Sequence, residues 1–323
     1  MRAGIAFAKQ DEMRIRQKSV WGLAALLAVV VGSGPVFAQD PPAPVPQPPQ
    51  QTPPQQPPQA PPPPAQTTPP AAPEQPQTSD PDVRVDPLQP DFNLAALPVT
   101  LRLPEHKMAF RVTHRFTRSL GQGDVADLIN NFFGFDSGAQ IGLEVRYGLL
   151  PGTQIGVHRT SDRTIEIFGQ QNLWQQKPDG RPLGIDVIAT LEGINNLRGQ
   201  KSPAIGLLVS RKIGKVAAAY VEPIFVANTN SLDTGSNNTT MIGLGGRVRI
   251  RPKVYLIGEV TPRVGGYKPG VDQGSFGIES RVGGHTFQIN FSNGFGTTLG
   301  QLARGGISSN SWFIGFNISR KFF

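Results

Sequence analysis

The stretch SWFIGFNISRKFF, residues 311–323, closes the chain and carries the strongest fold signal in the sequence. Its apolar residues fall on alternate positions, at Trp312, Ile314, Phe316 and Ile318, and the positions between the last three hold Gly and Asn. This period-two alternation predicts a β-strand with one apolar face and one polar face. A soluble sheet that ended in this way would expose an aggregation-prone edge. We therefore predict that the apolar face contacts lipid.

The first 38 residues have the organisation of an export signal peptide. A basic region around Arg14 precedes an apolar run of 11 residues, 21–31, and small residues lead to a predicted cleavage site after Ala38. The run is shorter than the roughly 20 residues that a membrane-spanning helix needs, so an uncleaved anchor is the less favoured alternative. Removal of residues 1–38 would lower the formal net charge from +8 to +5.

Residues 39–90 form a Pro- and Gln-rich segment that holds 21 of the 32 prolines. It has almost no apolar bulk to bury, and proline favours an extended chain, so we predict a disordered linker. We expect this linker to lie in the periplasm. It is either a plain spacer or a contact with the cell wall or another periplasmic component.

The remaining residues, 91–323, are predicted to form one domain of strands with no long amphipathic helix. Twelve segments combine strand length with alternating apolar positions. They are residues 108–118, 139–149, 153–160, 163–174, 183–194, 203–213, 216–228, 239–250, 254–264, 274–282, 285–293 and 311–322.

The connections between these segments alternate in length. Tight links follow segments 2, 6, 8 and 10, whereas longer links follow segments 1, 5, 7, 9 and 11. Outer-membrane barrels have this arrangement, with short periplasmic turns and long external loops. The connections at residues 161–162 and 175–182 do not follow this alternation of short and long, so the predicted number of strands ranges from 10 to 14. The predicted fold class is all-β: a transmembrane, antiparallel, up-and-down barrel of about twelve strands.

In such a barrel the last strand must pair with the first, because backbone groups cannot stay unpaired in hydrocarbon. The end of the chain also resembles the C-terminal assembly signal of bacterial outer-membrane barrels, which has a final aromatic residue behind alternating apolar positions. The residues that match are Trp312, Ile314, Phe316, Ile318 and Phe322, and the extra residue Phe323 leaves the register open.

Three stretches resemble an uncharacterised family of membrane-bound β-barrel domains. They are LRLPEHKMAFRVTHRF, GFDSGAQIGLEVRYGLLPGTQIGVHR and GRVRIRPKVYLIGEVTPR. The resemblance extends from about residue 88 to residue 323. It implies a barrel fold and a membrane location, and it implies no activity.

Charged residues occupy the strand face opposite the apolar one. On the lipid face each would cost about 2–4 kcal/mol at mid-depth, so we predict that they point into the lumen. The predicted lining is Arg111, Arg115, Glu144, Arg146, Asp186, Arg247, Arg249, Glu259, Arg263, Glu279 and Arg281. This set has three more positive than negative charges. It is either a selectivity lining or a plug of ion pairs.

The sequence gives little support for other chemistry. There is no cysteine, the four histidines lack metal-ligand spacing, and no basic stripe indicates nucleic-acid binding, so we predict no metal, no cofactor and no nucleic acid. HRTSD, residues 158–162, would suit a barrel lipid hydrolase with His158 and Ser161 in the site, but a strand-end turn is favoured.

The segment ADLINNFFGF, residues 126–135, is the one stretch with helix-like apolar spacing. Three roles stay open for it: a constriction inside the barrel, a contact with the membrane interface, or a simple cap on its loop.

We predict an outer-membrane β-barrel of a Gram-negative-type bacterium that contacts membrane lipid and depends on the outer-membrane assembly machinery. Its function is that of a narrow channel or a structural barrel with a charged lumen. A barrel lipid hydrolase and a soluble periplasmic β-sandwich are the alternatives.

Overall fold

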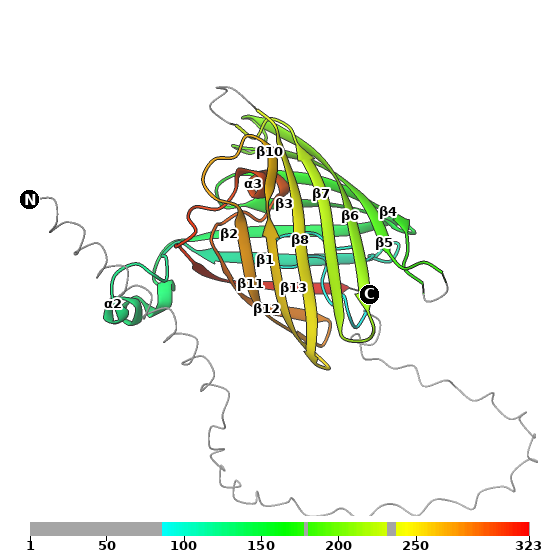
Figure 1. Ribbon diagram of the computed structural model, residues 1–323, viewed down its shortest axis with the longest axis horizontal. Coiled ribbons are helices and arrows are strands. Elements are labelled where there is room, and N and C mark those ends of the chain that lie inside the picture. The colour runs from blue at the N-terminus through cyan, green and yellow to red at the C-terminus, as the bar shows by residue number, and fades with distance from the viewer. Residues whose placement is uncertain (1–85, 178–179, 231–236, 323) are drawn as a thin grey trace, which may run out of the picture. The chain divides into compact units, whose positions relative to one another are not determined.

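The computed structural model describes residues 86–177, 180–230 and 237–322, and all structural statements refer to these residues. The predicted signal peptide and the predicted linker up to residue 85 lie outside them. The described chain forms a closed antiparallel β-barrel (Figure 1). The predicted fold class is therefore confirmed, and the alternative of a β-sandwich is wrong.

The strands agree closely with the twelve predicted segments. They are β1 (Met108–Phe116), β2 (Ala139–Leu150), β3 (Thr153–Thr160), β4 (Ile165–Trp174), β5 (Gly184–Gly193), β6 (Lys201–Ile213), β7 (Ala217–Val226), β8 (Thr239–Arg251), β9 (Val254–Thr261), β10 (Arg263–Gly266), β11 (Gln273–Val282), β12 (His285–Ser292) and β13 (Phe313–Phe322).

Strands β9 and β10 are two parts of one barrel strand, which is interrupted at Pro262. Proline has no N–H group for the ladder, but its carbonyl still accepts a hydrogen bond from the amide of Ile242 at 2.9 Å. Both parts pair with β8, so the barrel has twelve strands. The barrel closes where β1 pairs with β13, in a register that runs from Met108 opposite Phe322 to Arg115 opposite Gly315. The predicted pairing of the last strand with the first is confirmed.

The two ends of the barrel differ in the length of their connections. Short turns join β2 to β3, β6 to β7, β8 to β9 and β11 to β12. The last of these consists of Gly283 and Gly284, whose φ angles of 57° and 79° suit a two-residue hairpin turn. Most connections at the opposite end are longer, and the longest are residues 117–138 and 293–312. The two predicted exceptions, after β3 and after β4, are present as well.

Three short helices lie in the two longest loops. The first loop contains α2 (Val125–Asn130) and the 3-10 helix η2 (Phe132–Gly134), and the last loop contains α3 (Leu299–Arg304). In the described part of the chain, no helix has the length and apolar character needed to cross a membrane.

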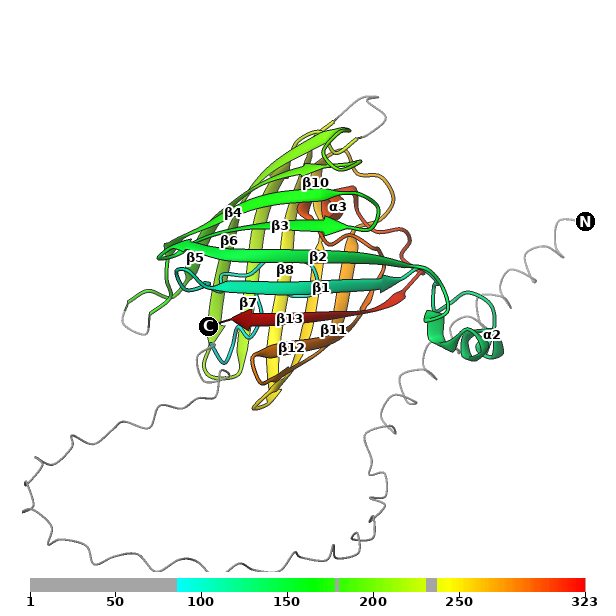
Figure 2. The same cartoon turned by 180° about the vertical axis from the view of Figure 1, so that it is seen from behind.

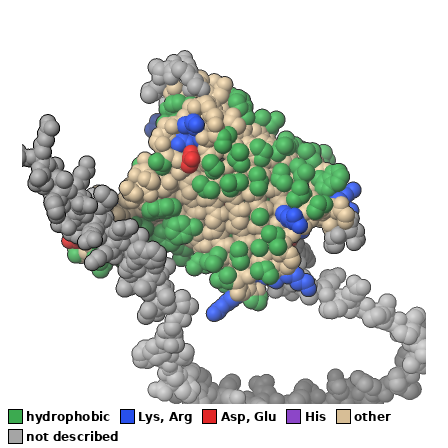
Figure 3. Space-filling model, viewed as in Figure 1, with side chains coloured by type: hydrophobic (Ala, Val, Ile, Leu, Met, Phe, Trp, Pro, Cys, Tyr) green, Lys and Arg blue, Asp and Glu red, His purple; other side chains and the backbone are tan. Residues whose placement is uncertain are grey.

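The barrel wall has an apolar outer face and a polar inner face. On β2, Ile141, Leu143 and Val145 point outward and are 39–47% exposed, whereas Glu144 and Arg146, at alternate positions, are only 3% exposed. Figure 3 shows hydrophobic side chains spread over the strand wall, with the visible Lys and Arg side chains near its margins. Lipid contact on the outside explains why the apolar side chains are the exposed ones.

The interior contains a segment that does not belong to the wall. Residues 86–103, here called the N-terminal hairpin, run inside the barrel before β1 begins (Figures 1 and 2). The segment reverses at Leu94–Leu97, where the amide of Leu94 donates to the carbonyl of Leu97 at 2.8 Å and Asn93 pairs with Pro98. Residues 86–90, which the sequence analysis assigned to the linker, are part of this hairpin.

The hairpin and helix α3 meet in one apolar cluster. Ala96 and Leu97 of the hairpin and Leu299, Leu302 and Ala303 of α3 belong to it. The wall residues of the cluster are Ile188, Ala204, Leu208, Ile224, Val226 and Met241. An eight-stranded barrel is just filled by its side chains. This twelve-stranded barrel is wider and is filled with two additional pieces of main chain.

Candidate functional site: the filled lumen

The side chains predicted to line the lumen are almost all buried. Arg249 is half-buried. The other ten are at most 8% exposed: Arg111, Arg115, Glu144, Arg146, Asp186, Arg247, Glu259, Arg263, Glu279 and Arg281. Since the outer faces of the same strands are exposed, these side chains occupy the interior, where most contact the hairpin or one another.

The tip of the hairpin is held by cationic and amide groups from β1 and β13. The carbonyl oxygen of Ala95 accepts hydrogen bonds from Arg111 Nη2 at 2.5 Å, Arg115 Nη2 at 3.2 Å and Asn317 Nδ2 at 3.0 Å. Asn317 Nδ2 also donates to Gln288 Oε1 at 2.6 Å. One main-chain oxygen therefore takes the place that an anionic group would occupy in front of two guanidinium groups.

A carboxylate from β9 holds the other side of the tip. Glu259 accepts hydrogen bonds from the amides of Ala95 at 3.0 Å, Ala96 at 2.9 Å and Leu97 at 3.1 Å. Charge-assisted hydrogen bonds of this kind are stronger than those between neutral groups. The tip is consequently fixed between β1 and β13 on one side and β9 on the other.

The rest of the hairpin backbone is also paired with wall side chains. Arg247 Nη2 donates to the carbonyl of Asn93 at 2.9 Å, Gln170 Nε2 to that of Val99 at 2.9 Å, and Tyr255 OH to that of Pro87 at 2.9 Å. A buried carbonyl without a partner is costly. The polar wall therefore supplies hydrogen-bond donors to the main-chain carbonyls of this irregular segment inside the barrel.

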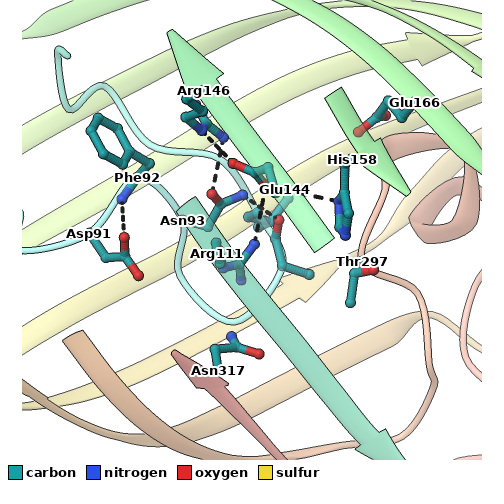
Figure 4. A network of polar contacts seen from close by, with 12 residues as sticks. Asp91, Phe92, Asn93, Arg111, Glu144, Arg146, His158, Glu166, Thr297 and Asn317 are labelled. Atoms are coloured by element: carbon teal, nitrogen blue, oxygen red, sulfur yellow. Dashed lines mark hydrogen bonds and ion pairs between the residues drawn. The ribbon is translucent and has the colours of Figure 1, made fainter. Parts of the chain in front are cut away.

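Glu144 is the centre of a charged cluster beside the hairpin (Figure 4). Its carboxylate lies 2.5 Å from Arg146 Nε, 3.6 Å from Arg111 Nη1 and 3.9 Å from His158 Nδ1. Arg146 also donates to Asn93 Oδ1 of the hairpin at 3.1 Å. The two ion pairs of Glu144 with Arg146 and Arg111 compensate the burial of charge.

Helix α3 is held from the wall by two carboxylates. Glu166 of β4 accepts a hydrogen bond from the amide of Leu299 at 2.9 Å. Glu192 of β5 accepts from the amide of Gln301 at 3.1 Å, from the Thr298 hydroxyl and from Arg304. Thus the last loop folds into the barrel and fills the end opposite the entry of the hairpin.

Part of the buried charge was not predicted from the sequence. The described residues include seven buried bases, Arg111, Arg115, Arg146, Arg247, Arg263, Arg281 and Lys321, and eight buried acids, Asp91, Glu144, Glu166, Asp186, Glu192, Glu222, Glu259 and Glu279. Among the described residues, the buried acids therefore outnumber the buried bases by one, whereas the predicted lining has three more positive than negative charges. The alternation of β4 could have revealed one of these acids. Ile165 and Ile167 lie on the outer face of this strand, so Glu166 between them faces the interior.

His158 and Ser161 do not form a catalytic pair. His158 is buried, and its Nε2 has no hydrogen-bond partner among the described residues. Ser161 lies in the turn after β3, where its hydroxyl accepts a hydrogen bond from the amide of Ile141 at 3.0 Å. A serine nucleophile needs a base within hydrogen-bond reach. The lipid-hydrolase alternative is not favoured.

The residues of the predicted assembly signal lie on the outer face of the last strand or next to it. Ile314, Phe316 and Ile318 are half-buried, Phe322 is exposed, and Trp312 directly precedes β13. The residue Phe323 lies outside the described residues.

Residues 92–322 match the family described as "Membrane bound beta barrel domain (DUF5777)". The chain belongs to this family. The family and the closed barrel confirm the predicted resemblance and show that the protein is a membrane-bound β-barrel. The family description names no activity.

Several solved structures of outer-membrane proteins are similar at low identity. The NanC porin is 10% identical, with a TM-score of 0.46 over 67% of this chain and 100% of the porin. The KdgM porin, solved with a disordered oligogalacturonate, is 8% identical, with a TM-score of 0.43 over 67% and 99% of the two chains. The COG4313 outer membrane channel from Pseudomonas putida F1 is 10% identical, with a TM-score of 0.45 over 68% and 97%. No match was found among curated proteins.

Proposed function

We propose that this protein is an outer-membrane channel that is closed, in the conformation described here, by its own N-terminal hairpin. Hydrogen bonds from the wall to the hairpin tip, Ala95–Leu97, are the observation that carries the proposal. The barrel starts and ends at the end with the short turns, which in outer-membrane barrels faces the periplasm. The hairpin therefore enters from the periplasmic side, and α3 fills the external side.

The closed arrangement leaves some polar groups of the wall without partners. Both carboxylate oxygens of Glu222, and Nε and Nη1 of Arg247, are buried and have no hydrogen-bond partner among the described residues. A buried polar group in this condition costs free energy, whereas water in an open lumen would hydrate it. The free-energy cost of these unpaired groups in the closed arrangement, and their hydration in an open one, support the proposal that the hairpin can leave the lumen.

The wall charges indicate what an open lumen would conduct. The buried acids of β3–β7 are Glu166, Asp186, Glu192 and Glu222, and all seven buried bases lie on β1, β2, β8, β10, β11 and β13. The two signs nearly cancel. We expect a small conductance for ions and small polar solutes, with only a weak preference between anions and cations.

A disulfide between the hairpin and the wall tests the proposal. The hydroxyls of Thr100 and Ser210 are 2.6 Å apart and buried, and the chain has no native cysteine. We expect brief openings of the wild-type channel in planar-bilayer recordings. In the double variant Thr100→Cys, Ser210→Cys, oxidation should abolish them, because the hairpin can no longer leave. Reduction should restore them.

The single variant Thr100→Cys, treated with the same oxidant, is the matched control and should open like the wild type. Unchanged openings in the oxidised double variant would overturn the proposal. So would the absence of openings in both the wild type and the reduced variant, and that result would favour a second candidate.

The second candidate is a structural barrel whose hairpin never leaves. It is favoured by the apolar side of the hairpin, where Phe92, Leu94 and Val99 are buried in one cluster with the wall residues Ala218, Tyr220 and Ile257. In that case the hairpin is simply part of the protein core.

We also infer a signal by which the assembly machinery recognises the chain. It consists of Trp312, which directly precedes the last strand, and the outward residues of that strand, Ile314, Phe316, Ile318 and Phe322. Removal of residues 322–323 should leave export intact and abolish most of the outer-membrane yield, measured by membrane fractionation and heat-modifiable gel migration.

The variant Met108→Ser is the control for this truncation. Met108 pairs with Phe322 and is similarly exposed, at 46% against 49%, but it lies at the start of the barrel. It should reduce the yield much less. A normal yield of the truncated chain, or equal losses in both variants, would contradict a terminal signal.

A further inference from the structure

The first long loop carries an apolar segment that the barrel does not use. In the α2–η2 segment, residues 125–135, Val125 is 61% exposed, Ile129 57%, Phe132 62% and Phe135 46%. Figures 1 and 2 both show α2 standing clear of the barrel wall. The segment is therefore not a constriction of the lumen, which was one of the three roles left open by the sequence.

The exposed side chains are continuous with the lipid-facing surface of the barrel. The ring of Phe135 packs on Phe116 at 4.4 Å, and Phe132 packs on Phe135 at 5.4 Å. Phe116 ends the outward row of β1, and its ring lies 6.2 Å from that of Phe316 in the outward row of β13. A chain of rings thus leads from the wall, which lipid surrounds, to the tip of the loop.

The segment holds its shape by local contacts. Asp124 and Asp127 form a capping box, in which the amide of Asp127 donates to Asp124 Oδ1 at 2.8 Å and the amide of Asp124 donates to Asp127 Oδ2 at 3.2 Å. Phe132 and Phe133 both have positive φ angles, 44° and 56°, which are uncommon for aromatic residues. The result is a set of rings displayed outward before any partner is bound.

The charges of the segment favour the hydrocarbon part of a lipid leaflet over its anionic headgroups. Residues 119–138 contain three aspartates and neither lysine nor arginine. In α2 the side chains of Asp127 and Asn130 lie on the opposite side from Val125 and Ile129, by helical spacing. A short amphipathic segment with aromatic residues on one face is suited to lie in the plane of a membrane interface.

We propose that the α2–η2 segment is an interfacial anchor, which places Val125, Ile129, Phe132 and Phe135 among the acyl chains of the outer leaflet beside the barrel. The apolar, lipid-facing surface of the barrel wall continues onto the α2–η2 segment without interruption. This anchor does not depend on whether the barrel conducts.

Lipid-specific fluorescence quenching tests the anchor in the full chain. The three native tryptophans, Trp21, Trp174 and Trp312, are changed to Phe, and a single tryptophan is introduced as Phe132→Trp. After folding into phosphatidylcholine vesicles, its emission should be quenched by acyl-chain-brominated phosphatidylcholine. The quenching should be similar to that of a Phe287→Trp reference on the outer face of β12.

The matched control is Asn130→Trp at the end of α2, on the side opposite Val125 and Ile129, and it should keep most of its fluorescence. Heat-modifiable migration confirms that each variant forms the barrel. Equal quenching at positions 130 and 132, or no quenching at 132, would overturn the proposal. Blue-shifted emission at 132 without quenching would also overturn it, because a second copy or another protein would then cover the rings.

Discussion

Helices α2 and α3 offer a comparison within one molecule. Each has six residues, and each lies in one of the two longest loops at the same end of the barrel. In α2 only Leu128 is buried, whereas five of the six residues of α3 are buried. Yet α2, VADLIN, has the clearer apolar face, and α3, LGQLAR, contains glycine and glutamine. In this barrel the more apolar helix is outside and the less apolar helix is inside.

The difference follows from what each helix finds around it. Outside the wall the surroundings are apolar, so the exposed apolar side chains of α2, Val125 and Ile129, need no cover. Inside the wall, Glu166 and Glu192 supply acceptors for the first turn of α3. A Cβ atom at Gly300 would lie 2.4 Å from the Glu192 carboxylate, so a larger residue at this position would displace the carboxylate that holds the helix. Helix α2 is capped by its own aspartates, whereas α3 depends on the wall.

The largest decrease in the free energy of unfolding is expected from Leu302→Ala in α3. Leu302 is 1% exposed and belongs to the apolar cluster of the interior, so its truncation should lower the free energy of unfolding by about 3 kcal/mol. The paired change in α2, Ile129→Ala, should stay within about 0.5 kcal/mol in detergent micelles. Urea unfolding of the two purified variants measures both values.

An equal decrease in the free energy of unfolding in the two variants would contradict the difference between the helices, because it would mean that α2 packs on the barrel as firmly as α3. A loss for Leu302→Ala close to zero would mean that α3 leaves the lumen without cost.

A smaller decrease in the free energy of unfolding is expected from Glu192→Ala. Glu192 is fully buried and accepts hydrogen bonds from Thr298, Gln301 and Arg304. Its loss removes the acceptor of the Thr298 hydroxyl and of Arg304, and it leaves the Gln301 amide with only its longer bond to the Thr298 hydroxyl oxygen at 3.3 Å. The loss should lower the free energy of unfolding by about 2 kcal/mol. Hydrogen exchange of the Gln301 and Leu302 amides should become faster, since the helix loses its contact with β5.

The corresponding change in α2 is Asp124→Ala, which removes the N-cap of that helix. Exchange should become faster within α2, while the stability of the barrel stays the same. If Glu192→Ala instead left exchange in α3 unchanged, Glu166 and the apolar cluster would be sufficient to hold this helix.

The sequence alone determined the wall of the barrel. Strand segments were predicted within a few residues, because a membrane barrel repeats one simple pattern, apolar outside and polar inside, along every strand. The closing pair of β1 and β13 followed from the requirement that no backbone group stays unpaired in lipid. Arg111, Glu144 and Arg247 could be placed inside by the same alternation, and the apolar residues of β13 outside.

Only the tertiary structure decided what fills the barrel. The N-terminal hairpin has no periodic pattern of its own, and its partners are far away in sequence, such as Asn317, which binds the carbonyl of Ala95 across 222 positions. The interior location of α3 likewise depends on Glu166 and Glu192, more than 100 positions earlier. A strand is recognised by its own alternation, but a segment inside a lumen is stabilised by polar groups that come together only when the barrel has closed.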